Sequence, residues 1–96
     1  MTRFVYKNQY LRAFDSLGVP DQRLVVVADS EIRSFCFTGK ASYGLRIKKL
    51  YSSKGGQIFE ARISAALRII WVRHQDIVYF QLLGDHDTVR KFLKKI

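Results

Sequence analysis

The stretch QIFEARISAALRIIWVRHQDIVYFQLL (residues 57–83) decides the fold, because it predicts three consecutive β-strands. Its first seven residues alternate apolar side chains with Glu60 and Arg62, as in a strand that buries one face. Residues 67–74 and 77–83 are apolar and rich in β-branched and aromatic residues, with a short polar link between them. Such short connections predict antiparallel neighbours.

Two further strands are predicted outside this stretch. Residues 43–51 alternate in polarity, and the turn-forming sequence SSKGG (52–56) connects them to the next strand. Residues 2–6 are short, β-prone and apolar at alternate positions. The sheet is therefore expected to contain four or five strands.

Three helices complete the expected elements. Apolar residues recur at helical spacing from Asn8, a candidate N-cap, to Gly18, which can end the helix. A second helix is predicted over about residues 20–37, and a closing helix of about two turns over residues 88–95, with Asp87 as its expected N-cap. The expected apolar face of the second helix consists of Leu24, Ala28, Ile32, Phe35 and Cys36.

This order of elements predicts a single α+β domain over residues 1–96. An N-terminal strand and a helical hairpin would pack on a four-to-five-stranded, mainly antiparallel sheet, followed by a short C-terminal helix. The hairpin would cover one face of the sheet, and the other would carry the polar members of the alternating strands. That basic concave face is expected to hold Arg46 and Lys48, or Lys49, with Glu60, Arg62 and Arg68.

Composition and charge restrict the possible functions. The single cysteine, Cys36, fits a reducing compartment, and no apolar run approaches the roughly 20 residues that span a membrane. We therefore expect a cytoplasmic protein with no membrane partner. The net charge is +9, and residues 40–96 carry 12 basic but only 4 acidic side chains. An excess concentrated in one half predicts a polyanionic partner, such as nucleic acid or an acidic protein.

The sequence GDHD (84–87) raises the question of a metal site. The chain has only two histidines and one cysteine, and neither H-x-x-x-H nor C-x-x-C spacing occurs. The sequence also lacks G-x-S-x-G and the glycine-rich phosphate-binding signatures. No metal ligands and no cofactor are therefore expected.

Metal-independent cleavage of RNA fits the remaining residues better. Arg62, Arg68 and a nearby lysine could stabilise charge building on a phosphate, and Glu60 and His86 could transfer protons. Histidine suits this role because it changes protonation state near neutral pH. Purely structural roles stand beside this hypothesis: Arg62 could pair with Glu60, and His86 could fill a loop.

Four segments resemble the RelE/ParE superfamily of bacterial type II toxin–antitoxin systems in order and spacing. The resemblance covers about residues 43–92, and RISAALRII (62–70) is its strongest part. The ending GDHD is similar to that of a subgroup of RelE-like sequences. The four segments are GLRIKKL (44–50), FEARIS (59–64), LRIIWV (67–72) and IVYFQLLGDHDTV (77–89).

The resemblance implies an mRNA interferase, an endoribonuclease that acts on ribosome-bound mRNA, with an acidic antitoxin as its partner. Arg68 matches the family's arginine that stabilises the transition state, and Arg62 matches a basic residue that holds the RNA. His86 lies near the position of a catalytic arginine or histidine in family members, whereas Glu60 lies where RelE itself has a lysine. RNA-binding roles are expected for Arg46, Lys48, Lys49, Arg62 and Arg90.

The sequence departs from the family at one position. Active members usually place a tyrosine where this chain has Arg90, and no tyrosine follows Tyr79. Two alternatives to the ribonuclease therefore stay open. One is a toxin of the ParE type that inhibits DNA gyrase without cleaving RNA, and the other is an inactive relative that binds RNA or an antitoxin.

Overall fold

The computed structural model describes residues 2–40 and 43–95. The chain forms a mixed α+β fold, which confirms the fold class predicted from the sequence. The elements in chain order are β1 (Arg3–Tyr6), α1 (Asn8–Ser16), α2 (Val19–Thr38), a 3₁₀ turn η1 (Tyr43–Leu45), β2 (Lys48–Ser53), β3 (Gly56–Arg62), β4 (Arg68–His74), β5 (Ile77–Gly84) and α3 (His86–Leu93).

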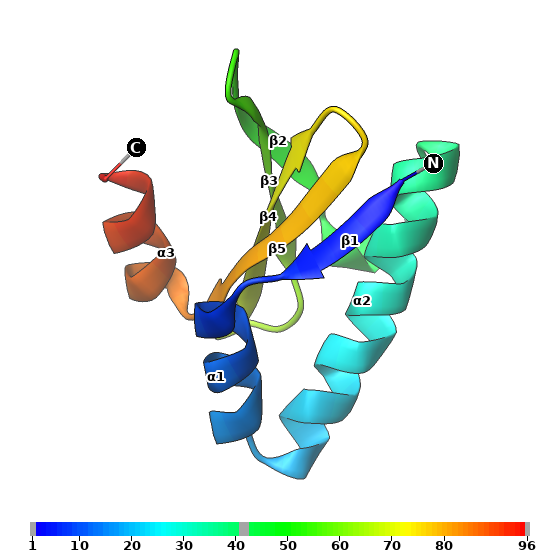
Figure 1. Cartoon of the computed structure of the whole chain (residues 1–96). Coiled ribbons are helices and arrows are strands. Elements are labelled where there is room, and N and C mark those ends of the chain that lie inside the picture. The colour runs from blue at the N-terminus through cyan, green and yellow to red at the C-terminus, as the bar shows by residue number, and fades with distance from the viewer. Residues whose placement is uncertain (1, 41–42, 96) are drawn as a thin grey trace.

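The sheet has five strands in the order β1-β5-β4-β3-β2. Strands β2 to β5 pair antiparallel through short connections, and only β1 runs parallel to its neighbour β5. Figure 1 shows α2 on one side of the sheet and α3 on the opposite side. No helix within residues 2–40 and 43–95 is long and apolar enough to cross a membrane.

The larger core lies between the helical hairpin and the sheet. Trp71 on β4 and Phe80 on β5 are fully buried there, against Val25, Ala28 and Ile32 of α2. Trp71 stacks on Phe59 of β3 with ring centroids 5.3 Å apart. The alternation read from the sequence thus correctly assigned the buried face of β3.

A second, smaller core lies on the other face of the sheet. Val89 of α3 packs there on Ile58, Ile70 and Leu82, together with the partly buried Phe92. The polar side chains expected on this face therefore share it with an apolar part, which α3 folds back to cover. The polar residues remain at the end of β3 and β4 where these strands adjoin the 63–67 connection.

The start of β2 and the length of the turn after it differ from the predicted ones. The strand predicted over residues 43–51 begins only at Lys48, because η1 precedes it and Arg46 has a positive φ of 47°. The turn after it is shorter than predicted, since β2 extends to Ser53 and β3 begins at Gly56. Gly56 is required there: its φ is +124°, and a Cβ atom would lie 2.6 Å from the Arg73 carbonyl oxygen.

The helical hairpin also corrects two predictions. Leu24, expected in the core, is 45% exposed, and its neighbour Val25 is buried instead. The buried stripe of α2 therefore follows Val25, Ala28 and Ile32, at spacings of three and four residues. Asn8 is the first helical residue of α1 rather than its N-cap, and Lys7 occupies the cap position without a side-chain hydrogen bond.

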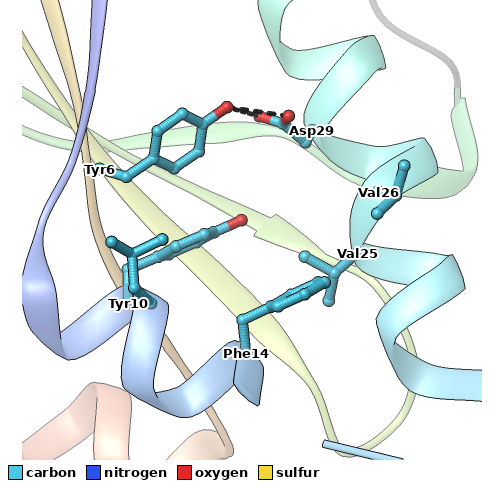
Figure 2. Close-up of a pocket in the computed structure, with 7 residues that line it drawn as sticks. Tyr6, Tyr10, Phe14, Val25, Val26 and Asp29 are labelled. Atoms are coloured by element: carbon cyan, nitrogen blue, oxygen red, sulfur yellow. Dashed lines mark hydrogen bonds between the residues drawn. The ribbon is translucent and has the colours of Figure 1, made fainter. Parts of the chain in front are cut away.

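A pocket of about 190 Å³ lies between β1, α1 and α2, and its two tyrosines have different surroundings (Figure 2). The Tyr6 hydroxyl lies 2.8 and 2.9 Å from the carboxylate oxygens of Asp29 and also accepts hydrogen bonds from Arg33. The Tyr10 hydroxyl is buried and finds no hydrogen-bond partner among the described residues. Burial, and secondarily the charge of Asp29, raises the pKa of Tyr10, so it stays protonated.

Removing these two hydroxyls should therefore have opposite consequences. Tyr6→Phe removes a hydrogen bond to a charged group and should lower the free energy of unfolding by about 1.5 kcal/mol. Tyr10→Phe removes a buried hydroxyl that lacks a partner, so its free energy of unfolding should be unchanged or slightly raised. Urea unfolding followed by circular dichroism measures both. A loss in Tyr10→Phe as large as that in Tyr6→Phe would contradict this account.

Candidate functional site

Strand register brings the predicted basic residues together at one end of the sheet. Arg62 on β3 lies directly opposite Arg68 on β4, and Arg68 lies opposite Gly84 on β5. His86 follows Gly84 by two residues and is the first residue of α3. Lys48 on β2 lies opposite Glu60 of β3, two residues from Arg62 on the same face. We call Lys48, Glu60, Arg62 and Arg68 the cationic cluster.

Glu60 occupies the centre of the cationic cluster. Among the described residues, Glu60 is the charged residue that is buried, with 5% of its surface exposed. One carboxylate oxygen lies 3.8 Å from Lys48 Nζ, and the other lies 3.5 Å from Arg68 Nη1. The Arg68 side chain is 13% exposed, whereas Lys48 is 62% exposed and largely solvated, so the contact with Arg68 is the stronger of the two.

The cluster keeps an excess of positive charge. It contains three cations and one carboxylate, and that carboxylate forms ion pairs with Lys48 and Arg68. Like charges placed directly opposite one another on adjacent strands, as Arg62 and Arg68 are, destabilise a sheet. Arg68 also has a buried Nε atom without a hydrogen-bond partner among the described residues. A bound anion would offset the excess positive charge. It would also give Arg68 a hydrogen-bond acceptor, because phosphate oxygens accept hydrogen bonds from the edge of a guanidinium.

The β5–α3 junction places His86 two residues after Gly84, the strand partner of Arg68. The Asp85 carboxylate accepts a hydrogen bond of 2.8 Å from the Thr88 backbone amide, so Asp85 caps α3. The predicted cap, Asp87, was wrong: it lies within the first turn of the helix. Thr88 packs so close to Gly84 that a Cβ atom there would lie 2.9 Å from it. The start of the helix is therefore fixed against the end of β5.

Removing the cap should destabilise α3 in a pH-dependent way. The hydrogen bond from Thr88 lowers the pKa of Asp85 below its ordinary 3.8. A carboxylate whose pKa is lower in the folded than in the unfolded state stabilises the protein at pH values above its ordinary pKa. This stabilisation is lost as the pH falls through the pKa of the folded state. Asp85→Ala should therefore lower the melting temperature at pH 7, and the difference from wild type should shrink below pH 3.8.

Asp87→Ala is the matched control for this experiment. It removes a carboxylate from the same helical turn but no cap, so its effect on the melting temperature should be smaller. Equal effects of the two substitutions would mean that the helix dipole, rather than the cap, accounts for the stabilisation.

The remaining predicted site residues lie in different places. Lys49 lies opposite Phe59, which packs toward the helical hairpin, so Lys49 is on the other face from Lys48. Arg46 is exposed and precedes β2 in the left-handed conformation. Arg90 is exposed and lies one turn after His86 on α3, so these two residues share a side of that helix.

Neither a metal-ligand group nor a reactive thiol appears in the described part of the chain. Within residues 2–40 and 43–95, no three His, Cys, Asp or Glu side chains come together as metal ligands could. Cys36 is partly buried, and burial raises the pKa of its thiol even though the Arg73 charge opposes this. The thiolate that a nucleophile requires is therefore disfavoured.

Together, the five-stranded sheet, the hairpin on one face and the short helix on the other form the fold of RelE-like toxins. A chain of the archaeal RelE–RelB complex from Pyrococcus horikoshii OT3 superposes with a TM-score of 0.69 at 15% identity, over 88% of this chain and 93% of that one. A chain of the E. coli DinJ–YafQ complex gives a TM-score of 0.70 at 15% identity, over 93% and 98%.

The YoeB dimer from Staphylococcus aureus is a third similar structure. Its chain gives a TM-score of 0.66 at 15% identity, over 88% of this chain and 97% of that one. No protein-family model and no curated protein sequence matches this chain. At such low identity the similarity establishes the fold, and the chemistry has to be argued from this chain's own residues.

Proposed function

We propose that this protein is the toxin of a type II toxin–antitoxin pair and an endoribonuclease that cleaves mRNA on the ribosome. The observation that supports this most is the cationic cluster. It places Arg62 and a partly unpaired Arg68 side by side on rigid strands, with more cations than carboxylates. The similarity of the fold to RelE, YafQ and YoeB supports the toxin role.

The proposed reaction uses the chain's side chains and solvent water. His86 removes the proton of the ribose 2′-hydroxyl, the 2′-oxygen attacks phosphorus, and the bond to the 5′-oxygen breaks as that oxygen takes a proton from water. Arg68 and Arg62 stabilise the negative charge that builds on the phosphate oxygens. The exposed His86 is accessible for proton transfer, whereas Glu60 is buried and ion-paired, so we assign it to holding Arg68.

The proposed partners follow from the charge. mRNA bound to the ribosome presents the polyanion, and the chain's net charge of +9 favours its approach. An acidic antitoxin would bind the same positive surface and block it. YafQ is solved with DinJ as a toxin–antitoxin complex, which supports a protein partner of this kind here. The site of action would be the cytoplasm.

The test is inducible expression followed by primer extension on two mRNAs that differ only in their start codon. Wild type should produce cuts in the translated mRNA and not in the untranslated one, and Arg68→Ala and His86→Ala should reduce them. DNA damage without mRNA cuts would instead support the gyrase-inhibiting alternative, to which Arg90 in place of the family's tyrosine points. If neither mRNA cuts nor DNA damage occurs, the protein is a relative that binds RNA or antitoxin without chemistry.

A further inference from the structure

A groove of about 470 Å³ lies on the same face of the sheet as the cationic cluster. Its lining comes from the sheet, including the β2–β3 hairpin, and from α3, which lies beside the sheet in Figure 1. Tyr51 of β2 and Phe92 of α3 contribute its aromatic side chains. The other principal lining residues are Ser53, Ile58, Val72 and Gln81.

The lining of the groove suits a flat ring with polar edges. Ile58 and Val72 provide an apolar floor, while the hydroxyl of Ser53 and the carboxamide of Gln81 can form hydrogen bonds. Tyr51 is 56% exposed, because its ring contributes little to either core. A volume of about 470 Å³ falls within the range of roughly 300–1,000 Å³ found for small-ligand sites.

The groove adjoins the cationic cluster along two strands. On β3, Arg62, Glu60 and Ile58 alternate along one face, and on β4 Arg68, Ile70 and Val72 do the same. At about 3.4 Å per residue, Ile58 lies roughly 7 Å along β3 from Glu60. Lys48 is exposed beside Glu60, at the edge nearest to Tyr51. A phosphate chain on the cluster would therefore pass the mouth of the groove.

We propose that this groove binds one unpaired nucleobase of the RNA strand, with Tyr51 as the stacking residue and Phe92 opposite it. The inference rests on the proposed function and adds a base-binding subsite to it. The occupant is a nucleobase because the neighbouring charge is positive, and single-stranded RNA combines phosphates with aromatic faces. Tyr51 would thus supply an aromatic contact in a chain that has Arg90 where the family places a tyrosine.

The experiment measures affinity for ribosomes programmed with an mRNA made uncleavable by 2′-deoxy substitution. Stacking on an aromatic side chain contributes about 1–3 kcal/mol per base, so Tyr51→Ala should weaken binding about 5- to 150-fold. Tyr51→Phe keeps the ring and should bind like wild type. Phe37→Ala is the matched control, because Phe37 is 67% exposed on α2, on the far side of the sheet.

Abasic nucleotides introduced one at a time identify the base. At one position, an abasic mRNA should bind wild type more weakly than intact mRNA does, by the same factor as the Tyr51→Ala substitution. The Tyr51→Ala variant should bind that abasic mRNA and the intact mRNA equally well. Equal binding by wild type and Tyr51→Ala overturns the base-binding subsite and leaves the nuclease standing if primer extension shows cuts. Failure of wild type to bind programmed ribosomes at all overturns both proposals.

Discussion

Arg68→Ala is expected to abolish mRNA cleavage, with a loss of at least about 100-fold in the single-turnover rate. Removing one preorganised group that stabilises transition-state charge typically costs about 10²- to 10³-fold in rate. Arg68 meets the structural requirement for such a group, since it is 13% exposed, held by Glu60 and placed directly opposite Arg62. Cleavage of mRNA on purified ribosomes measures the loss.

The Arg68→Ala substitution also removes an ion-pair partner of Glu60, so its effect on stability has to be separated from its effect on cleavage. Arg68→Ala leaves the buried carboxylate of Glu60 with the solvated Lys48 as its ionic contact, and an underpaired buried charge destabilises a protein. The double variant Arg68→Ala with Glu60→Gln removes both charges and should recover stability without recovering cleavage. If cleavage returned with stability in the double variant, Arg68 would be a structural residue and its proposed chemical role would be wrong.

Trp71→Ala is expected to prevent stable folding. Trp71 is fully buried at the centre of the larger core, stacked on Phe59 and in edge contact with Phe35. Truncating a buried tryptophan costs about 3–5 kcal/mol, which is a large part of the roughly 5–15 kcal/mol that stabilises a typical small domain. Circular dichroism during urea unfolding measures this, because Trp71 is the chain's single tryptophan and its fluorescence is lost.

Trp71→Phe provides the control for that prediction. The indole Nε1 is buried without a hydrogen-bond partner among the described residues, so phenylalanine keeps the ring contact and removes an unsatisfied donor. This variant should remain folded, with a much smaller loss of stability than the alanine variant. Unfolding of both variants to the same extent would mean that the indole itself is required and that the ring contact kept by phenylalanine does not account for the stability.

The sequence predicted strands β3, β4 and β5 to within one residue at each end, because their apolar patterns reflect burial directly. It failed for the start of β2, where the left-handed Arg46 interrupts an alternation that otherwise continues. One position of the α2 face was also misassigned, since Leu24 and Val25 are both apolar and their own sequence does not distinguish them. Packing against the sheet selects Val25.

The candidate site was predicted in part. The short connection between two strands already placed Arg62 and Arg68 near each other, and the register makes them direct neighbours. The contact of Arg68 with Glu60 depends on the burial of Glu60, which periodicity does not report. The N-cap was missed because both Asp85 and Asp87 precede an apolar helical face. The spacing of three residues from Asp85 to Thr88 was the signal that could have identified Asp85 as the cap. Tyr51 and Phe92 are 41 positions apart, and only folding brings them to one groove.

The parallel pairing of β1 with β5 bears on when the sheet is completed during synthesis. Arg3 pairs with Ile77 and Tyr6 with Phe80, so β1 waits for a partner that is synthesised 74 residues later. The helical hairpin can form earlier, but its core partners Trp71 and Phe80 also come late in the chain. Contacts between such distant segments form slowly, because the intervening loop must first close. A nascent chain therefore lacks the assembled sheet until β5 has been synthesised.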